Sequence, residues 1–267
     1  MSSRTRVLLT GASACIGLAT ARALCAAGWE VWGTSREIKR LPAGLPNFHP
    51  LELSLNQPGS IYAAWIRAKA ESGGFEVVIN NAGEGWFESI ADVSMENVRT
   101  QFDILLFGPL QLMQLALPDL REKRGLLINV TSLAARLPIP YMAPYSAAKA
   151  ALASLTATLR LELAGSGVRI VDLQPGDIQT HFNDVMQPPP DGRPRAAWDA
   201  MVASMAAAPG PAVVAAEICR LVGGSDAPPM RIIGDFLQAR LTPLAARILP
   251  ARWLERILLR HYGQRER

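Results

Sequence analysis

Short apolar runs alternate with longer helical segments along most of the chain. Runs with the length and composition of strands lie at residues 7–10, 30–34, 49–53, 76–79, 126–130, 168–173 and 230–233. They are apolar enough to be buried on both faces, which is typical of parallel strands covered by helices. The alternation predicts an α/β fold, a doubly wound parallel sheet.

The segments between the runs carry helix signals. Predicted helices end at Ala27 before Gly28, cover residues 58–71, 94–120 and 212–222, and include one that contains Tyr145 and ends near Gly165. Ser94 is expected to cap the third of these helices and Pro109 to bend it. Ile61, Trp65 and Ile66 are expected to form the apolar side of the second.

Composition narrows the class of protein. The 267 residues are 49% hydrophobic and 19% charged, so we expect one globular domain over residues 1–267. The net charge of +4 is spread along the chain until the C-terminal end, which favours small acidic ligands over nucleic acid. Cys15, Cys25 and Cys219 have neither metal-site nor disulfide spacing. This predicts a reducing compartment such as the cytoplasm, and no metal site.

The first apolar run leads into a glycine-bearing turn, Gly11 to Gly17, and then a helix. Such a turn presents backbone N–H groups and a helix N-terminus to phosphate, as in dinucleotide-binding sheets. The second run ends in Ser35 and Arg36. An arginine there accommodates the 2′-phosphate of NADP, whereas an acidic residue binds the ribose of NAD. The sequence favours NADP(H), with a solvated surface arginine as the alternative.

Ser132, Tyr145 and Lys149 are candidate catalytic residues. Tyr145 and Lys149 are four residues apart in an alanine-rich segment, so on a helix they share one face. Ser132 follows the apolar run that ends at Val130. An adjacent ammonium favours the phenolate, so we expect Lys149 to lower the pKa of Tyr145 and make it a general acid or base. From this pair alone, a solvated lysine beside a half-buried tyrosine remains an equal alternative.

Two further segments differ in composition. Residues 180–211 are rich in Pro, Met and Ala, and a long segment beside a site is more often a lid than a linker. Residues 235–267 form a C-terminal helical extension. Its apolar Leu244, Ile248, Trp253, Ile257 and Leu258 oppose Arg247, Arg252, Arg256 and Arg260. Packing on the domain or on a second subunit is expected, with peripheral membrane contact as the alternative.

Four separated motifs resemble those of the classical short-chain dehydrogenase/reductase family. They are TGASACIG at 10–17, NNAG at 80–83, Ser132 with YSAAK at 145–149, and PGDIQT at 175–180. The resemblance covers Arg6 to about Thr180 and implies a Rossmann fold that binds NADP(H). It implies that Tyr145 exchanges a proton with the substrate oxygen, that Ser132 holds this oxygen, and that Lys149 binds the nicotinamide ribose.

The resemblance also implies which residues contact the cofactor. These are Gly11, Ser13, Cys15, Ile16, Gly17, Ser35, Arg36, Glu52, Leu53, Asn80, Asn81, Ala82, Gly83, Tyr145, Lys149, Pro175, Gly176, Ile178 and Thr180. Glu52 stands where the family usually has an Asp that contacts the adenine, and Ile178 and Thr180 where the carboxamide is met.

The sequence departs from the family pattern at two positions. Cys15 replaces the usual middle glycine, which puts a side chain where the backbone normally approaches the cofactor. Leu105 aligns with the Asn that commonly completes the catalytic group, so we expect activity by a slower or rerouted proton path. An Asn at position 105 is expected to be tolerated, unless Leu105 belongs to the core.

Within the family, the chain looks most like enzymes acting on hydroxysteroids, retinoids and other lipophilic alcohols or ketones. This resemblance rests on three features: GTSR at 33–36, FGPL at 107–110 and the basic C-terminal helix. A homodimer or homotetramer is expected. The alternative function is a noncatalytic NADP-binding sensor or scaffold, against which the complete set of Ser132, Tyr145 and Lys149 argues.

Overall fold

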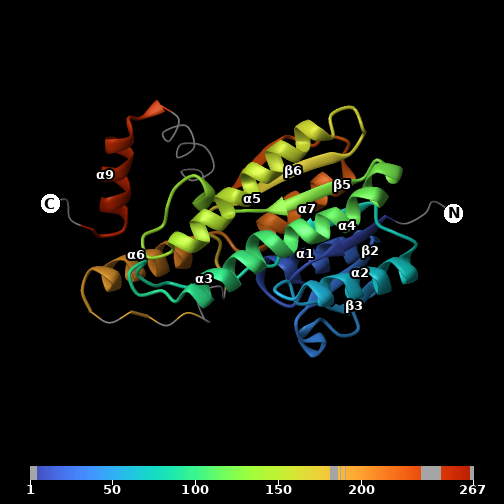
Figure 1. Cartoon of the computed structure of the whole chain (residues 1–267), viewed down its shortest axis with the longest axis horizontal. Helices are drawn as coiled ribbons and strands as arrows, with labels where there is room; N and C mark the ends of the chain where they lie inside the picture. Colours follow the sequence, from blue (N-terminus) through green and yellow to red (C-terminus); the bar gives the residue numbers. More distant parts are fainter. Residues whose placement is uncertain (1–4, 181–185, 187, 190, 236–247, 265–267) are drawn as a thin grey trace.

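The computed structural model describes residues 5–180, 186, 188, 189, 191–235 and 248–264. Its centre is a parallel sheet in the order β3-β2-β1-β4-β5-β6-β7 (Figure 1). The strands are β1 (Arg6–Leu9), β2 (Glu30–Ser35), β3 (Phe48–Glu52), β4 (Val77–Asn80), β5 (Leu126–Val130), β6 (Arg169–Pro175) and β7 (Met230–Ile233). The order reverses between β1 and β4, and a crevice opens at the carboxyl ends of strands at such a point. The predicted fold class is confirmed.

Helices cover both faces of the sheet because its strands are apolar on both sides. One face packs against α2 (Pro58–Ser72), α4 (Gly108–Lys123) and α5 (Ala143–Glu162), and the other against α1 (Cys15–Ala26) and α7 (Ala212–Gly223). Alternate strand residues serve the two cores: Leu127 belongs to the first and Ile128 to the second. This is the expected consequence of the two-residue period of a strand.

Two helix predictions need correction. The segment after Ser94 is not one helix bent at Pro109: α3 (Met95–Phe102) is followed by a π-helical turn, Asp103–Phe107, and then by α4. The break therefore precedes the proline. In α2, Ile61 and Trp65 are buried as predicted, but Ile66 is 49% exposed because the helix turns it away from their face. The Ser94 cap is confirmed, since Ser94 Oγ accepts from the Asn97 N–H at 3.1 Å.

The segment 180–211 contains a helix, α6 (Arg193–Ala207), although positions 181–185, 187 and 190 lie outside the described residues. The α6 side chains Trp198 and Met201 join an apolar cluster with Phe87 and Met142. Trp198 meets Phe87 edge to face, with ring centroids 5.2 Å apart. The segment is thus anchored beside the carboxyl ends of the strands, and its movement as a lid stays a prediction.

The C-terminal extension includes α9 (Ala251–His261), whose lower end comes near α6 (Figure 1). Leu244 and Arg247 lie outside the described residues. Tyr262 packs on the α6 cluster, and Gln264 Nε2 donates to the Arg193 carbonyl at 2.9 Å. Trp253 and Ile257 are half exposed. Among the described helices, none alone is long and apolar enough to cross a membrane, though α6 and α7 pass that test as a bent pair.

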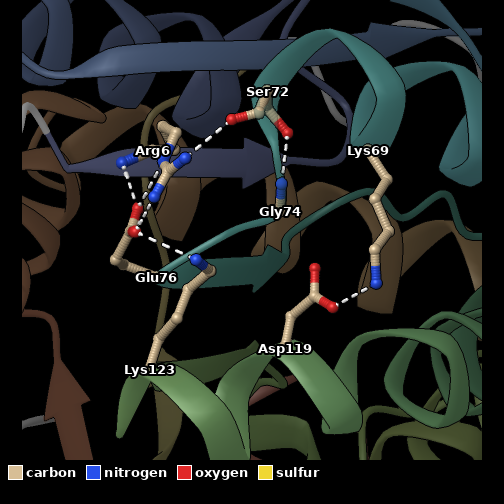
Figure 2. Close-up of polar contacts among 7 residues, drawn as sticks. All are labelled: Arg6, Lys69, Ser72, Gly74, Glu76, Asp119 and Lys123. Carbon is tan, nitrogen blue, oxygen red and sulfur yellow. Dashed lines mark hydrogen bonds and ion pairs between the residues drawn. The ribbon is translucent and has the colours of Figure 1, made fainter.

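The amino ends of β1 and β4 are joined by an ionic cluster far from the crevice (Figure 2). Arg6 Nε donates to Glu76 Oε2 at 3.0 Å, and Arg6 Nη1 donates to the Ser72 carbonyl at 2.7 Å. Beside it, Lys69 Nζ on α2 donates to Asp119 Oδ1 on α4 at 2.5 Å. Arg6 thus ties α2 to the sheet, and Lys69 ties α2 to α4, at the end opposite to the candidate site.

Candidate active site

A cavity of about 500 Å³ opens at the carboxyl ends of the strands, where the strand order reverses. Most residues predicted from the sequence line it: Gly11, Ser13, Cys15, Ile16, Gly17, Ser35, Arg36, Leu53, Asn81, Ala82, Gly83, Ser132, Tyr145, Lys149, Pro175, Gly176, Ile178 and Thr180. These residues come from the ends of different strands and from α5, so the fold assembles the site from distant parts of the chain.

Glu52 and Asn80 are not among the lining residues. Glu52 is exposed because alternate strand residues point to opposite faces, and Leu51 and Leu53 take the buried side. Asn80 is buried, and its Nδ2 donates to Asn129 Oδ1 at 2.8 Å, so it joins β4 to β5. The cofactor contacts expected of these two residues stay predictions.

The glycine turn is packed directly against the segment after β4. Gly11 has φ +71°, and a Cβ on Gly17 would lie 1.9 Å from the Gly11 carbonyl oxygen, so neither position accepts a side chain. Thr10 Oγ1 accepts from the backbone N–H groups of Asn81 and Ala82 at 2.9 and 3.0 Å. Asn81 Nδ2 donates to the Thr10 carbonyl at 2.9 Å. This bracing leaves a fixed concave backbone at the start of α1, as a dinucleotide phosphate requires.

Cys15 lies in this turn in a left-handed conformation, with φ +49°. Glycine adopts this region freely, whereas a residue with a Cβ is strained there. Cys15 also lines the cavity. The positive φ explains why the family usually has a glycine at this position. Cys15 keeps the same backbone conformation.

Replacing Cys15 by Gly should relieve this strain, whereas Cys15→Ala should keep it. We expect the Gly variant to unfold with a free energy about 0.5 to 1 kcal/mol higher than the Ala variant, allowing for the greater freedom of glycine in the unfolded chain. Denaturant titration of both variants measures the difference. An Ala variant that is the more stable of the two would contradict the strain argument.

Arg36 lies at the end of β2 with its side chain 59% exposed, and its Nη1 meets Glu84 Oε2 at 3.1 Å. The neighbouring Ser35 is buried, and its Oγ accepts from the Glu37 N–H at 3.3 Å. Arg40 and Glu84 also line the cavity. Neither residue was predicted from the sequence, although Arg40 follows Arg36 closely enough to serve as a second phosphate ligand.

Ser132 and Tyr145 both line the cavity, and their side chains share a hydrogen bond. Ser132 Oγ also accepts from the Ala134 N–H at 3.0 Å, which fixes the hydroxyl. Burial raises the pKa of Tyr145, and the hydrogen bond with Ser132 opposes this only in part. The pKa of Tyr145 is thus raised and not lowered as the sequence predicted, because the effect of burial is the largest.

Lys149 lies one turn after Tyr145 on α5 and is only 4% exposed. Its Nζ donates to the Val130 carbonyl at 2.8 Å and lies 5.9 Å from the centre of the Tyr145 ring. Burial lowers the pKa of Lys149 to about 8, while the charge of Asp172 acts in the opposite direction. The solvated-lysine alternative is therefore excluded.

Leu105 lies in the π-helical turn and is fully buried in the core that packs on α4 and α5. Its neighbour Ile104, which the sequence analysis did not select, lines the cavity instead. Of the two alternatives for position 105, the structure supports a core residue.

We expect Leu105→Asn to lower the free energy of unfolding by about 3 kcal/mol, because apolar contacts are lost and an unpaired amide is buried. Leu105→Met keeps the volume and should cost less than about 1.5 kcal/mol. Thermal unfolding of the two variants distinguishes them. An Asn variant as stable as the Met variant would remove Leu105 from the core.

The cavity wall beside Tyr145 is apolar. Ile139, Met142, Met201 and Met205 line it, the last two from α6. The methionines of this segment are evident in the sequence, but their place in the cavity depends on how α6 packs. Asp177, which also lines the cavity, accepts a hydrogen bond from Ser204 Oγ on α6.

Comparisons with known proteins agree on one family. The model of the short chain dehydrogenase family matches residues 5–190. The short-chain dehydrogenase ptmH of Penicillium ochrochloron is 33% identical over 208 residues, which cover 76% of each chain. A short-chain dehydrogenase structure from Streptomyces avermitilis is 27% identical, with a TM-score of 0.81, covering 96% of this chain and 98% of that one.

One further structure is of a short chain dehydrogenase from Burkholderia cenocepacia in complex with NADP. It is 26% identical to this chain, has a TM-score of 0.71, and the match covers 92% of this chain and 98% of that one. None of these three relatives is named as a hydroxysteroid or retinol dehydrogenase. The family likeness therefore stops short of that subgroup.

Proposed function

Because the chain belongs to the short chain dehydrogenase family, we propose that it is an NADP-dependent oxidoreductase for a lipophilic carbonyl compound or secondary alcohol. The observation that carries the proposal is the meeting of Ser132, Tyr145 and buried Lys149 in one cavity with the braced glycine turn. A binding module alone has no need of a phenol, a hydroxyl and a desolvated ammonium at the same wall.

The cavity fits a dinucleotide. Gly11 and Gly17 form a backbone surface that a side chain would fill, at the start of α1, where phosphate is favoured. Arg36 and Arg40 supply positive charge at the end of β2, where a 2′-phosphate would lie. The NADP in the Burkholderia relative supports the same choice.

The protein's own groups would handle the proton. When bound, the nicotinamide supplies or accepts the hydride. In carbonyl reduction, Ser132 Oγ holds the substrate oxygen, and Tyr145 gives its phenolic proton to that oxygen. A raised pKa keeps Tyr145 protonated and thus able to act as the acid at neutral pH. The charge of Lys149 then stabilises the phenolate that remains.

The substrate class is inferred from the wall beside Tyr145. Ile139, Met142, Met201 and Met205 present apolar surface next to the phenol. Thioethers adapt to ligands of different shape at little cost. We therefore infer a lipophilic ketone or alcohol, with α6 as the movable wall.

The competing function is a noncatalytic NADP-binding sensor or scaffold. Cys15 and Leu105, both departures from the family pattern, are the features that favour it. NADPH consumption with a panel of lipophilic ketones separates the two, because a sensor would bind NADPH without oxidising it.

Replacing Tyr145 by Phe should lower kcat by about 100- to 10,000-fold, the usual contribution of a positioned general acid. NADPH affinity should stay within a few-fold, since the ring is kept. Tyr141→Phe is the matched control, because Tyr141 packs on Phe87 outside the cavity lining and should keep normal turnover. A Tyr145 variant with more than about a tenth of the wild-type rate would disprove the assignment.

Exchanging Ser35→Asp together with Arg36→Ala should reverse the preference from NADPH to NADH. The arginine can pair with a phosphate, whereas an acidic side chain pairs with ribose hydroxyls. Lys39→Ala is the control, since Lys39 is a neighbouring exposed cation outside the cavity lining. Binding constants measured by nucleotide fluorescence decide the matter, and equal wild-type affinities for the two nucleotides would refute the role of Arg36.

A further inference from the structure

A series of hydrogen bonds between mostly buried side chains lies behind Ser132, Tyr145 and Lys149, where β5 and β6 are paired. We call it the polar chain. Asp172 on β6 is only 6% exposed. Its Oδ1 accepts from Thr131 Oγ1 at 2.5 Å, and its Oδ2 accepts from Gln174 Nε2 at 2.6 Å. Arg136 Nε donates to Gln174 Oε1 at 3.0 Å. Every member of this chain has a partner, although no motif used above contains Asp172.

The guanidinium fixes the direction of both hydrogen bonds of the Gln174 amide. Arg136 can only donate, so the Gln174 amide must turn its oxygen toward Arg136 and its NH₂ toward Asp172. The Asp172 oxygen on that side must therefore accept. Burial raises the pKa of Asp172, while the hydrogen bonds of Thr131 and Gln174 and the charges of Arg136 and Lys149 oppose the rise. Because Thr131 donates to the other oxygen, both Asp172 oxygens accept hydrogen bonds, as those of a carboxylate do.

Asp172 lies directly behind the segment that holds Lys149. Thr131, which donates to Asp172, follows Val130, whose carbonyl accepts from Lys149 Nζ at 2.8 Å. The Thr131 backbone N–H donates to the Leu173 carbonyl at 2.8 Å, and Ser132 comes next in the chain. Thr131 therefore holds Asp172 in place. In the sequence it stands between Val130, the hydrogen-bond partner of Lys149, and the catalytic Ser132.

The surroundings of Lys149 offer little else to balance its charge. Gly83 lies beside it in the segment after β4, and Tyr145 precedes it on α5. Glu84 and Asp177 line the same cavity. Of the titratable groups in the described part of the chain, Asp172 is the one whose charge raises the pKa of Lys149. A buried ammonium without a counter-charge would lose its proton.

We propose that Asp172 is a positioning residue for the reaction: it is the buried counter-charge that keeps Lys149 cationic in the active site. It acts on the substrate only through Lys149 and Tyr145. The catalytic meaning rests on the proposed function, whereas the charge coupling between Asp172 and Lys149 does not, so the two can fail separately.

The first test is a pH titration of Lys149 in the full chain without added nucleotide. NMR monitors the side-chain signal of Lys149, which is assigned by its absence in Lys149→Met. Asp172→Asn removes the charge and can keep the hydrogen bonds, because Asn accepts from Gln174 and donates to Thr131. We expect this variant to lower the pKa of Lys149 by about one unit. Asp119→Asn is the control: Asp119 is equally buried but lies in the distant ionic cluster (Figure 2). It should leave the titration of Lys149 unchanged.

The second test does not depend on the folding of the Asn variant. Charge coupling is reciprocal, so Lys149→Met should raise the pKa of the Asp172 carboxyl, observed by ¹³C NMR. In catalysis, Asp172→Asn should shift the alkaline limb of the reduction rate to lower pH, whereas a purely structural defect would lower the rate equally at every pH. Coupled titrations in a protein that reduces no ketone would disprove the proposed function but support this inference. Titrations of Lys149 and Asp172 that are independent of each other would overturn it.

Discussion

The burial of the Lys149 ammonium is the constraint on which the site depends. Lys149 is only 4% exposed, so its ammonium has lost its water and must be compensated by fixed groups of the protein. The Val130 carbonyl supplies a direct partner, and Asp172 supplies charge from behind β5. Burial also strengthens the interaction between Lys149 and Tyr145. A charge acts on a neighbouring phenol more strongly in a poorly hydrated site than in water.

The same end of the sheet also forms the surface proposed to bind the nucleotide phosphates. This surface is made of backbone and not of charged side chains. Gly11 and Gly17 have no side chains, so the turn packs directly against Asn81. Thr10 and Asn81 use their polar atoms to brace the turn, which leaves the N–H groups at the start of α1 for a ligand. The cavity thus has a rigid wall toward the proposed phosphates and an apolar, adaptable wall of α6 methionines toward the proposed substrate.

Much of this architecture could be predicted from the sequence because it follows from local patterns. Alternating apolar runs and helices specify a doubly wound sheet, and the motif residues meet because they stand at the carboxyl ends of neighbouring strands. The failures arise where tertiary packing decides. Ile66 is turned outward by the helix, and the π-helical turn replaces the expected bend at Pro109. The pKa of Tyr145 is set by its burial, which spacing along a helix does not reveal.

Isotope transfer shows whether Tyr145 and Lys149 serve hydride transfer to a carbonyl carbon. NADPH carrying deuterium at both C4 positions is incubated with the protein and lipophilic ketones, and the alcohols are analysed by mass spectrometry. We expect one deuterium on the carbinol carbon with the wild type, and its loss with Lys149→Met. Tight NADPH binding without deuterium in any alcohol, together with no reduction of NADP⁺ by the corresponding alcohols, would contradict this role of Tyr145 and Lys149.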